Sequence, residues 1–378
     1  MIFFAMYCAS QNIESTINSI LKVVSAPNEA VLIMLAEKSA DLFQPLQEAL
    51  NEANILFFGG IFPSLIDGKS MHDEGLVFEV IPVYTRPQII QDLDKENFRI
   101  PDFRNLTNNN DRIWSAITFV DGLTENIGAF LSKIFYEFGN RATYFGGGAG
   151  SASFVKRPCV FSNEGCFQDA AVICFIDMDI SVSSGHGWEK VAGPLIATKT
   201  NKNIISELNW ENAFEVYKRA ISQSCQLDIN SQNFFDIAKS HPVAIRKEEA
   251  ENVVRDPIAV NENGELICVG EIAENSILDL LEGNEQALIS SAAKVTGNAF
   301  KSRESSPQSC LVASCISRAL YLGERYEKEL EAMEQKALEI EPKSVLQGAL
   351  TLGEISSQRN GYLEFFNKTT VVAALYDK

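Results

Sequence analysis

The sequence predicts a mixed α/β fold of layered sheets flanked by helices, and three observations support this class. Apolar runs such as AVLIMLA at 30–36 and AAVICFI at 170–176 have the length of strands that are buried on both faces. Segments with apolar residues at helical spacing lie between such runs. The order strand, helix, strand, loop, strand also recurs at 30–83, 114–177 and 310–376. We therefore expect two similar halves with internal βαββ repeats and with helices outside the sheets.

Length and composition indicate a globular protein with more than one core. The 378 residues exceed the usual size of a single core, so we expect one domain at 1–222 and a second at 223–378. Apolar residues make up 46% and charged residues 22% of the chain, which is typical of globular domains. The net charge of −18 argues against partners that require a positive surface, so neither nucleic acid nor an anionic membrane is expected.

The cysteines and the N-terminal segment favour a cytoplasmic protein in a reducing compartment. Eight cysteines are present without a C-x-x-C pair, and most stand inside apolar runs, where the thiol behaves as a small hydrophobic group. The start MIFFAMYCAS has no basic residue, is too short to span a bilayer and is typical of a first buried strand. No later apolar run reaches 18 residues, so no membrane span is expected.

Periodicity and turn residues define the elements of the first 112 residues. Apolar residues of 13–24 recur at helical spacing, Pro27-Asn28 ends that helix, and Ser39 is a candidate N-cap for a helix that ends near residue 53. The apolar stretches around these helices are typical of buried strands. The expected strands are 2–9, 30–36, 55–58 with Gly59-Gly60 after it, and 76–83, whereas residues 86–112 form an irregular excursion.

The same signals continue through the rest of the chain. A strand at 113–120 and the turn Asp121-Gly122 precede a strongly amphipathic helix at 124–138. An Asn-Glu-Asn-Gly turn within 256–272 predicts two strands around it. The other expected elements are strands at 191–198 and 204–208, a helix at 211–222, an extended run from His241-Pro242, helices at 287–300 and 324–341, and strands at 311–316, 348–355 and 365–375.

The stretch from Thr143 to Trp188 combines a glycine-rich segment, an apolar strand and a Gly-His-Gly-Trp turn. Gly146, Gly147 and Gly148 lack a Cβ, so the backbone can turn sharply there or approach a ligand closely. A glycine-rich turn after a strand can present N–H groups to an anion, which makes these three residues candidate ligand contacts. The alternative is a tight turn with nothing bound, because no Gly-Lys-Ser/Thr follows and no helix begins there.

Five motifs, in this order, resemble those of the FIST proteins, which carry paired FIST N and FIST C domains. They are FFGGIFPSLIDG, YFGGGAGS, SGHGWEKVAGPLIATKTNKNIISELN, CISR at 315–318, and LTLGEIS followed by GYLEFFNKTTVVAAL. Each motif is moderately specific, but their order and spacing together are specific, and the likeness covers nearly the whole chain. The resemblance implies a cytoplasmic sensory module for a small ligand, with amino acids as candidates. It also implies an output through a kinase, cyclase or chemoreceptor, here expected to be a separate protein, and a haem-binding, nitric-oxide-responsive alternative.

Five further residues carry side chains suited to a small polar ligand. His186, between two glycines, is expected to be accessible, and three interpretations stay open: a ligand contact beside Trp188, a hydrogen bond to its own backbone, or axial ligation of haem. Arg318 suits either a bidentate clamp on a ligand carboxylate or a first-turn salt bridge. Glu354 at a strand bend is a candidate partner for a ligand ammonium, and Asn367 is a candidate amide contact.

The sequence favours a binding protein over an enzyme. No G-x-S-x-G motif occurs and no cysteine is near a histidine in the sequence, so Cys166 is expected to be a packed thiol, with a nucleophile as the minor alternative. His72 is expected to be solvated and His241 to mark a strand start, and without an i, i+4 histidine pair no metal site is predicted. We expect a sensory protein without a cofactor that binds a small polar metabolite. A haem sensor, a protein-binding platform and an enzyme are the alternatives.

Overall fold

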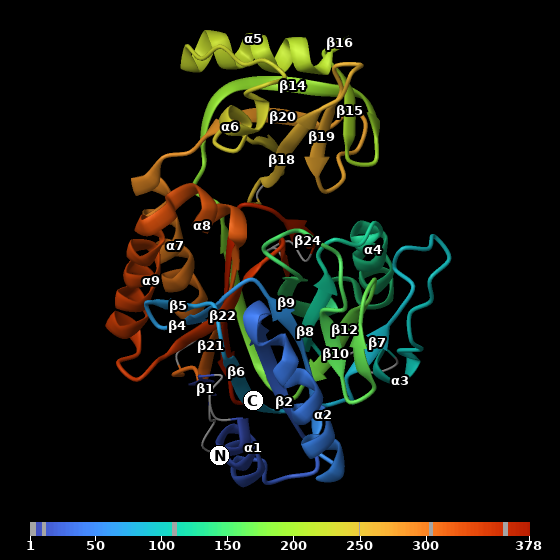
Figure 1. The fold of residues 1–378 in the computed structure, drawn as a ribbon, viewed down its shortest axis with the longest axis vertical. Coiled ribbons are helices and arrows are strands. Elements are labelled where there is room, and N and C mark those ends of the chain that lie inside the picture. Colours follow the sequence, from blue (N-terminus) through green and yellow to red (C-terminus); the bar gives the residue numbers. More distant parts are fainter. Residues whose placement is uncertain (1–4, 10–12, 108–111, 249, 302–304, 358–361) are drawn as a thin grey trace.

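The computed structural model describes residues 5–9, 13–107, 112–248, 250–301, 305–357 and 362–378, which form a three-sheet body below a smaller upper layer (Figure 1). In these residues no helix is long and apolar enough to cross a membrane. The α-helices are α1 Ile13–Val23, α2 Phe43–Glu52, α3 Arg104–Thr107, α4 Ile127–Phe138, α5 Ala213–Cys225, α6 Phe234–Ala238, α7 Glu285–Lys301, α8 Ile316–Leu322 and α9 Tyr326–Ile340.

Three six-stranded sheets form the body. The first has the order β1 (Ala5–Cys8), β6 (Leu76–Pro82), β2 (Glu29–Ala36), β3 (Leu56–Phe62), β10 (Val160–Ser162), β11 (Gly165–Phe167). The second has the order β7 (Gln88–Ile90), β12 (Ala171–Ile176), β8 (Trp114–Asp121), β9 (Ala142–Ala149), β23 (Glu354–Ser357), β24 (Leu363–Phe366). The third has the order β13 (Asp179–Gly185), β25 (Thr370–Tyr376), β21 (Ser309–Cys315), β22 (Leu346–Thr351), β4 (Leu65–Asp67), β5 (Ser70–His72).

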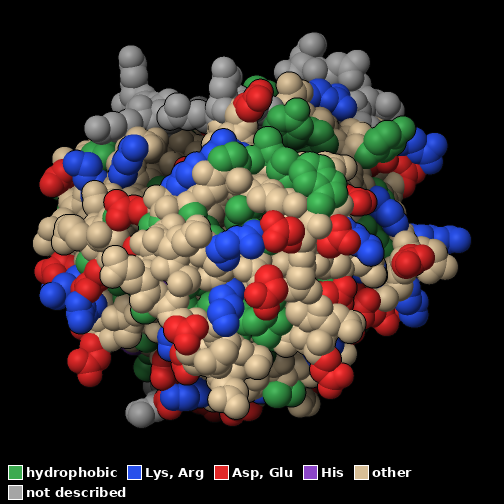
Figure 2. All heavy atoms as spheres, turned by 90° about the horizontal axis from the view of Figure 1, so that it is seen from above, with side chains coloured by type: hydrophobic (Ala, Val, Ile, Leu, Met, Phe, Trp, Pro, Cys, Tyr) green, Lys and Arg blue, Asp and Glu red, His purple; other side chains and the backbone are tan. Residues whose placement is uncertain are grey.

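The upper layer is one seven-stranded sheet covered by α5 and α6 (Figure 1). Its order is β14 (Glu189–Asn201), β20 (Ile277–Glu282), β17 (Val243–Ile245), β18 (Val253–Val260), β19 (Leu266–Val269), β15 (Ile204–Leu208), β16 (Glu211–Asn212). The layer has its own apolar core, to which Val216, Tyr217 and Leu280 contribute. Acidic and basic side chains are interspersed over the face of the molecule that is seen from above (Figure 2).

The three body sheets follow one plan. In each sheet the first long strand of a repeat is the central one and lies between two other strands of the same repeat. It is parallel to one of them and antiparallel to the last strand of the repeat. The parallel pairs are β2–β3, β8–β9 and β21–β22, and the antiparallel pairs are β2–β6, β8–β12 and β21–β25. A hairpin from another repeat extends each sheet, namely β10–β11 beside β3, β23–β24 beside β9 and β4–β5 beside β22. The mixed α/β class and the internal repeats are confirmed, and the repeating unit occurs three times, twice before the upper layer and once after it.

The exchanged hairpins cross the expected domain boundary. β4, from the first repeat, pairs with β22 of the third, and β23 of the third pairs with β9 of the second. The upper sheet likewise joins β14 to β20. Residues 1–222 and 223–378 therefore share three sheets, and the position 222/223 lies inside α5.

Alternate residues of the body strands point into two different apolar layers. In β25, Val371, Ala373 and Leu375 face the core shared by the three sheets, whereas Val372 and Ala374 face the layer under α7 and α9. The two faces of a strand alternate residue by residue, so burial of both faces requires an unbroken apolar run. This is why the runs at 30–36, 171–176 and 370–376 carry almost no polar residue.

The glycine-rich segments are strands and not turns. Gly146, Gly147 and Gly148 lie within β9, where β8 pairs on one side and β23 on the other. Gly59 in β3 and Gly348 in β22 occupy the same register as Gly146. A Cβ at these three positions would lie 1.6–1.9 Å from a carbonyl oxygen of the central strand. The predicted turn at Gly146–Gly148 is therefore wrong: these glycines allow close approach of parallel strands, as Gly59 and Gly348 do in the other two sheets.

Other differences from the expected elements concern turns. The expected strands 348–355 and 365–375 are each divided, by a bend after Thr351 and by the turn Asn367–Thr369. Ser39 does not cap a helix, because its Oγ accepts a hydrogen bond from Gly75 N at 2.8 Å and α2 begins only at Phe43. Strand β20 and helix α8 were not expected from the sequence.

Candidate functional site

A cleft of about 950 Å³ lies between the upper layer and the second body sheet. Its lower wall is formed by residues 122–125, 127–128 and 131–132 at and before the start of α4 and by 363–365 of β24. Its upper wall is formed by segments of β14, β17, β18 and β19 and by the loop after β19. The lining carries charges of both signs: Lys202, Lys247 and Arg255, and Glu125, Glu271 and Glu364.

Arg255 is the buried cation of this cleft. Its side chain comes from β18, and the residue is only 7% exposed. Nε donates to Glu271 O at 2.8 Å, and Nη1 donates to Phe365 O at 3.0 Å and to Asn367 Oδ1 at 3.3 Å. Among the described residues no carboxylate forms an ion pair with Arg255, and Nη2 makes no hydrogen bond. Burial lowers the pKa of Arg255 to about 10, against the attraction of Glu364 and Glu271.

The loop after β19 makes room for this guanidinium. Gly270 has a φ of +84°, and a Cβ there would lie 2.9 Å from Arg255 Nε and 3.1 Å from Cζ. On the other side the guanidinium is held by the carbonyl of Phe365 and the amide of Asn367. The guanidinium is therefore fixed in position before any ligand arrives, which favours binding of a planar anion in a defined orientation.

The start of α4 lies on the lower wall of the cleft, and the carboxylate of Glu271 reaches it from the upper wall. Glu271 is exposed, and its carboxylate oxygen would be 3.2 Å from a Cβ at Gly128, so it lies against the first turn of α4. Asn126 precedes α4 without capping it, since its Nδ2 donates to Leu93 O at 2.7 Å. The cleft thus offers a fixed cation and nearby anions, which suits a ligand that carries both charges.

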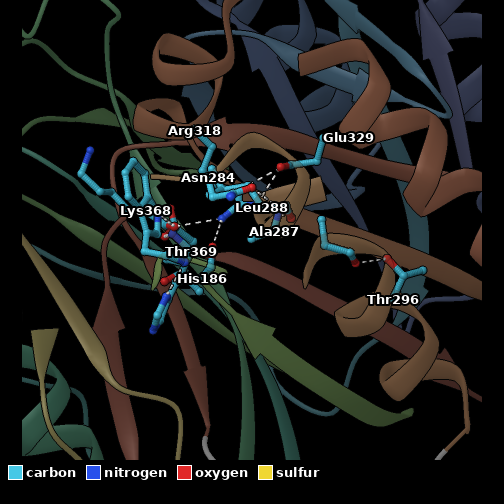
Figure 3. A network of polar contacts seen from close by, with 12 residues as sticks. His186, Asn284, Ala287, Leu288, Thr296, Arg318, Glu329, Lys368 and Thr369 are labelled. Carbon is cyan, nitrogen blue, oxygen red and sulfur yellow. Dashed lines mark hydrogen bonds and ion pairs between the residues drawn. The ribbon is translucent and has the colours of Figure 1, made fainter. Parts of the chain in front are cut away.

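The predicted site residues lie instead around the turn Asn367–Thr369, which leads from β24 into β25 (Figure 3). Arg318, on α8, is completely buried. Its Nε and Nη2 donate to the two carboxylate oxygens of Glu329 at 2.9 and 2.7 Å, and Nη2 also donates to Leu288 O. Nη1 donates to His186 O at 2.5 Å and to Lys368 O at 3.1 Å. All five N–H groups are used, so the salt-bridge interpretation describes Arg318 and the ligand clamp does not.

His186 and Trp188 form the second part of this buried cluster. His186 is 8% exposed, because Gly185 and Gly187 press the loop against α7 instead of opening it to solvent. Nδ1 accepts from Trp188 N at 2.9 Å, and Nε2 lies 3.4 Å from Glu251 Oε1. Burial lowers the pKa of His186, against the attraction of Glu251. Both ring nitrogens are engaged within the protein, so His186 does not fit an axial haem ligand, and the predicted accessibility is wrong.

Glu354, Asn367 and Trp188 also contact the turn. Glu354 is fully buried, with Oε1 accepting from Thr351 Oγ1 at 2.7 Å and Oε2 from Thr369 N at 3.2 Å, and burial raises its pKa well above the ordinary range. Trp188 Nε1 donates to Lys368 O at 3.2 Å. The sequence therefore identified residues that do meet, but their polar groups satisfy one another. Only Asn367, through Arg255, is connected to the cleft.

The remaining candidate residues do not form a reactive centre. Cys166 lies in the short strand β11, and burial raises the pKa of its thiol to about 12, so it is not an activated nucleophile. Gly146, Gly147 and Gly148 line no part of the cleft, because their strand is paired on both sides. His72 stacks on Tyr7 at a ring-centroid distance of 4.0 Å.

The fold and the cleft define a layered α/β protein with a charged cavity between two layers. The FIST N domain model matches residues 29–211, and the FIST C domain model matches residues 213–357. Together they cover most of the chain, and the protein belongs to the FIST family, whose domains are associated with sensory function in signal transduction. No curated protein matches the sequence.

Sequence reasoning missed Arg255 because the resembling motifs supply only part of the cleft lining, including Lys202, Asn203 and 363–365. Arg255, Gly270 and Glu271 lie outside every motif that carried the resemblance. One signal was present: Arg255-Asp256 interrupts the apolar strand of VVRDPIAV. Charged residues in such a strand are rarely buried without a partner, so they mark a paired or functional position.

Proposed function

We propose that the protein is a cytoplasmic sensory module that binds a small zwitterionic metabolite, such as an amino acid, in the cleft between the upper layer and the body. The observation that carries this proposal is Arg255, a buried cation that borders the cleft and has no carboxylate partner among the described residues. A ligand carboxylate placed against Nη2 would supply the missing countercharge. Charge-assisted hydrogen bonds of this kind contribute about 1.5–3 kcal/mol each.

The ligand ammonium would be accepted near the start of α4, by Glu125 of the lower wall and by the carboxylate of Glu271, which reaches there from the upper wall. Glu271 and Glu125 are exposed carboxylates in the cleft lining, close to the start of α4. An α-amino acid is much smaller than a cavity of about 950 Å³, so binding would favour closure of the upper layer onto the body. We propose that this closure, without chemical turnover, is read by a separate protein such as a kinase, cyclase or chemoreceptor.

Asn367 links the cleft to the buried cluster. Its Oδ1 accepts from Arg255, and the next residue, Lys368, accepts from Arg318 and Trp188 through its carbonyl. A ligand that binds Arg255 would therefore act on a turn that also contacts the β13–β14 connection, because Trp188 of that connection donates to Lys368 O. This contact network is a physical route between ligand and body.

The experiment is a thermal-shift screen against amino acids, their decarboxylated amines and other small metabolites, followed by calorimetry. A ligand at a hundred times its Kd adds about 2.7 kcal/mol of stability. We expect an amino acid to shift the midpoint and its amine analogue to fail. Arg255→Gln should weaken binding at least about 10-fold, since a charge-assisted pair is lost. Arg219→Gln, on the exposed face of α5, is the matched control and should bind normally.

Undiminished binding in Arg255→Gln would place the ligand elsewhere. No shift with any metabolite would reject the small-ligand proposal and favour a protein-binding platform, for which partner capture is the next assay.

A further inference from the structure

A second cluster of chemically distinctive side chains lies at the base of the upper layer. Cys225 is the last residue of α5, His241 lies between α6 and β17, and Glu282 is the last residue of β20. Cys225 Sγ, a ring nitrogen of His241 and a carboxylate oxygen of Glu282 lie within 4.8 Å of one another. None of these three residues is among the described residues that line the cleft, so this is a separate site.

The ring of His241 is held in one tautomer. Nδ1 lies 2.8 Å from Ile237 O, and a carbonyl oxygen can only accept, so Nδ1 carries the proton. Tyr217 Oη fixes the backbone by donating to His241 O at 2.6 Å. In the neutral ring Nε2 then carries the lone pair, and these contacts set its direction. Metal-binding histidines are oriented in this way, with the other ring N–H donating to a carbonyl or carboxylate.

Nε2 of His241 is buried and has no hydrogen-bond partner among the described residues. The residue as a whole is 3% exposed. The nearest charged group is Glu282 Oε1 at 3.5 Å, and a carboxylate oxygen is also an acceptor. Two acceptors that face each other without a proton repel, whereas a cation between them would satisfy both. The half-buried thiol of Cys225 completes the group on a third side.

We propose that Cys225 Sγ, His241 Nε2 and a Glu282 carboxylate oxygen bind a divalent transition metal of the zinc class. Thiolate, imidazole and carboxylate are all ligands that zinc accepts, and three protein ligands leave a fourth position for water or a ligand. Bond lengths of about 2.0–2.3 Å require ligand atoms roughly 3.3–3.8 Å apart. The Glu282 side chain is 47% exposed, so a small rotation of it can close the site.

The metal would join three elements of the upper layer, namely α5, the segment before β17, and β20. The segment that ends at His241 also contacts the buried cluster of the body, because Lys239 O accepts from Lys368 Nζ at 2.8 Å. A metal at this position would stiffen the base of the upper layer, where that layer joins the body.

The test is metal binding by the full chain after removal of metal with a chelator. We expect one Co²⁺ per chain, a thiolate-to-cobalt charge-transfer band in the near ultraviolet, displacement by Zn²⁺, and no stabilisation by Mg²⁺. Cys225→Ser should abolish the band, and Glu282→Gln should weaken Co²⁺ binding at least about 10-fold. Both positions are partly exposed, so both variants are expected to fold.

The matched controls are Cys166→Ser and His72→Gln, which change a half-buried cysteine and a half-buried histidine outside the cluster. Both should bind Co²⁺ like the unaltered protein. The proposal is overturned if the unaltered protein retains no Co²⁺ or Zn²⁺ at equimolar concentration, or if Cys225→Ser keeps the charge-transfer band. An imidazolium–carboxylate pair between His241 and Glu282 would produce the first of these results.

Discussion

Two buried arginines on either side of one turn differ in how their charge is balanced. Arg318 donates to Lys368 O and has the carboxylate of Glu329 as its partner. Arg255 donates to Asn367 Oδ1 and is otherwise surrounded by carbonyl oxygens. A buried guanidinium that pairs with a buried carboxylate has its charge balanced within the protein. A buried guanidinium that is bonded only to neutral groups does not. This difference makes Arg318 structural and Arg255 the candidate ligand group.

Removing the charge of Arg318 should destabilise the protein strongly. Arg318→Met leaves Glu329 buried without its partner, and breaking one side of a buried pair typically lowers the free energy of unfolding by about 3–5 kcal/mol. The double variant Arg318→Met, Glu329→Leu should recover most of that loss, because both charges are gone. Thermal and denaturant unfolding check both expectations.

An exposed ion pair provides the control for Arg318. Arg325 pairs with Glu285 and its side chain is 62% exposed, so Arg325→Gln should change the stability by less than about 1 kcal/mol. A loss in Arg318→Met no larger than in Arg325→Gln would contradict the structural role of Arg318.

At the scale of elements, the glycines of the parallel strand pairs determine how closely these strands approach. Gly146→Ala would place a Cβ 1.6 Å from Thr118 O, in the middle of the second body sheet. Backbone must move to relieve such a contact, and overpacking in a core typically costs about 1–3 kcal/mol or more. We expect Gly146→Ala to lower the thermal midpoint, with a loss of unfolding free energy near the upper end of this range.

Gly297→Ala is the matched comparison for Gly146→Ala. Gly297 lies within α7, and an added Cβ would meet only the flexible side chain of Lys336 at 3.2 Å. Replacing a helical glycine by alanine should stabilise by about 0.5–1 kcal/mol. Equal midpoints for the two variants would show that the glycines of β9 are not required for strand approach.

The sequence predicted elements wherever one strong period ran without interruption. The helices at 13–23, 127–138 and 285–301 and the strands at 29–36 and 171–176 were expected nearly as they are. The prediction was wrong where the same residues are typical of two different structures. Three glycines in a row are as typical of a turn as of a crowded strand pair, and only the tertiary structure shows which applies.

The sequence motifs brought together residues that do lie close in space, but they did not show that the polar groups of these residues are already bonded. The motifs located residues that meet at the turn Asn367–Thr369, but the partners that close the cluster are remote in sequence. Glu329 comes from α9 and Leu288 from α7, and both occupy the N–H groups that a ligand would have needed. Whether a polar side chain is free or already satisfied depends on such long-range contacts, which periodicity does not encode.

At the scale of the whole molecule, the three sheets enclose one core, and a buried carboxyl lies within it. Glu79 is on β6, in the first sheet, is 1% exposed, and neither of its oxygens makes a hydrogen bond within the described residues. Burial raises its pKa from 4.5 to about 7, and Ser309 of the third sheet opposes this only slightly. Loss of the proton from Glu79 therefore places a charge in the core between the first and the third sheet.

The stability should consequently fall as the pH rises through neutrality. Between about pH 4.5 and 7 the folded state holds a proton on Glu79 that the unfolded state has released, so a rising pH favours unfolding. The raised pKa corresponds to about 3 kcal/mol, fully lost above pH 7. Glu79→Gln keeps the shape without the charge and should exceed the stability of the unaltered protein by less than about 1 kcal/mol at pH 5 but by about 3 kcal/mol at pH 8.

Thermal midpoints of both proteins from pH 5 to 8.5 test this expectation, with Glu331→Gln on the exposed face of α9 as the control. His186 acts in the opposite direction, because its lowered pKa makes the folded state less stable in acid. That contribution is present in both proteins and cancels in their difference. The difference between Glu79→Gln and the unaltered protein should therefore grow from pH 5 to 8. A constant difference would mean that Glu79 stays ionised inside the core and that a cation not bonded to it in this structure balances its charge.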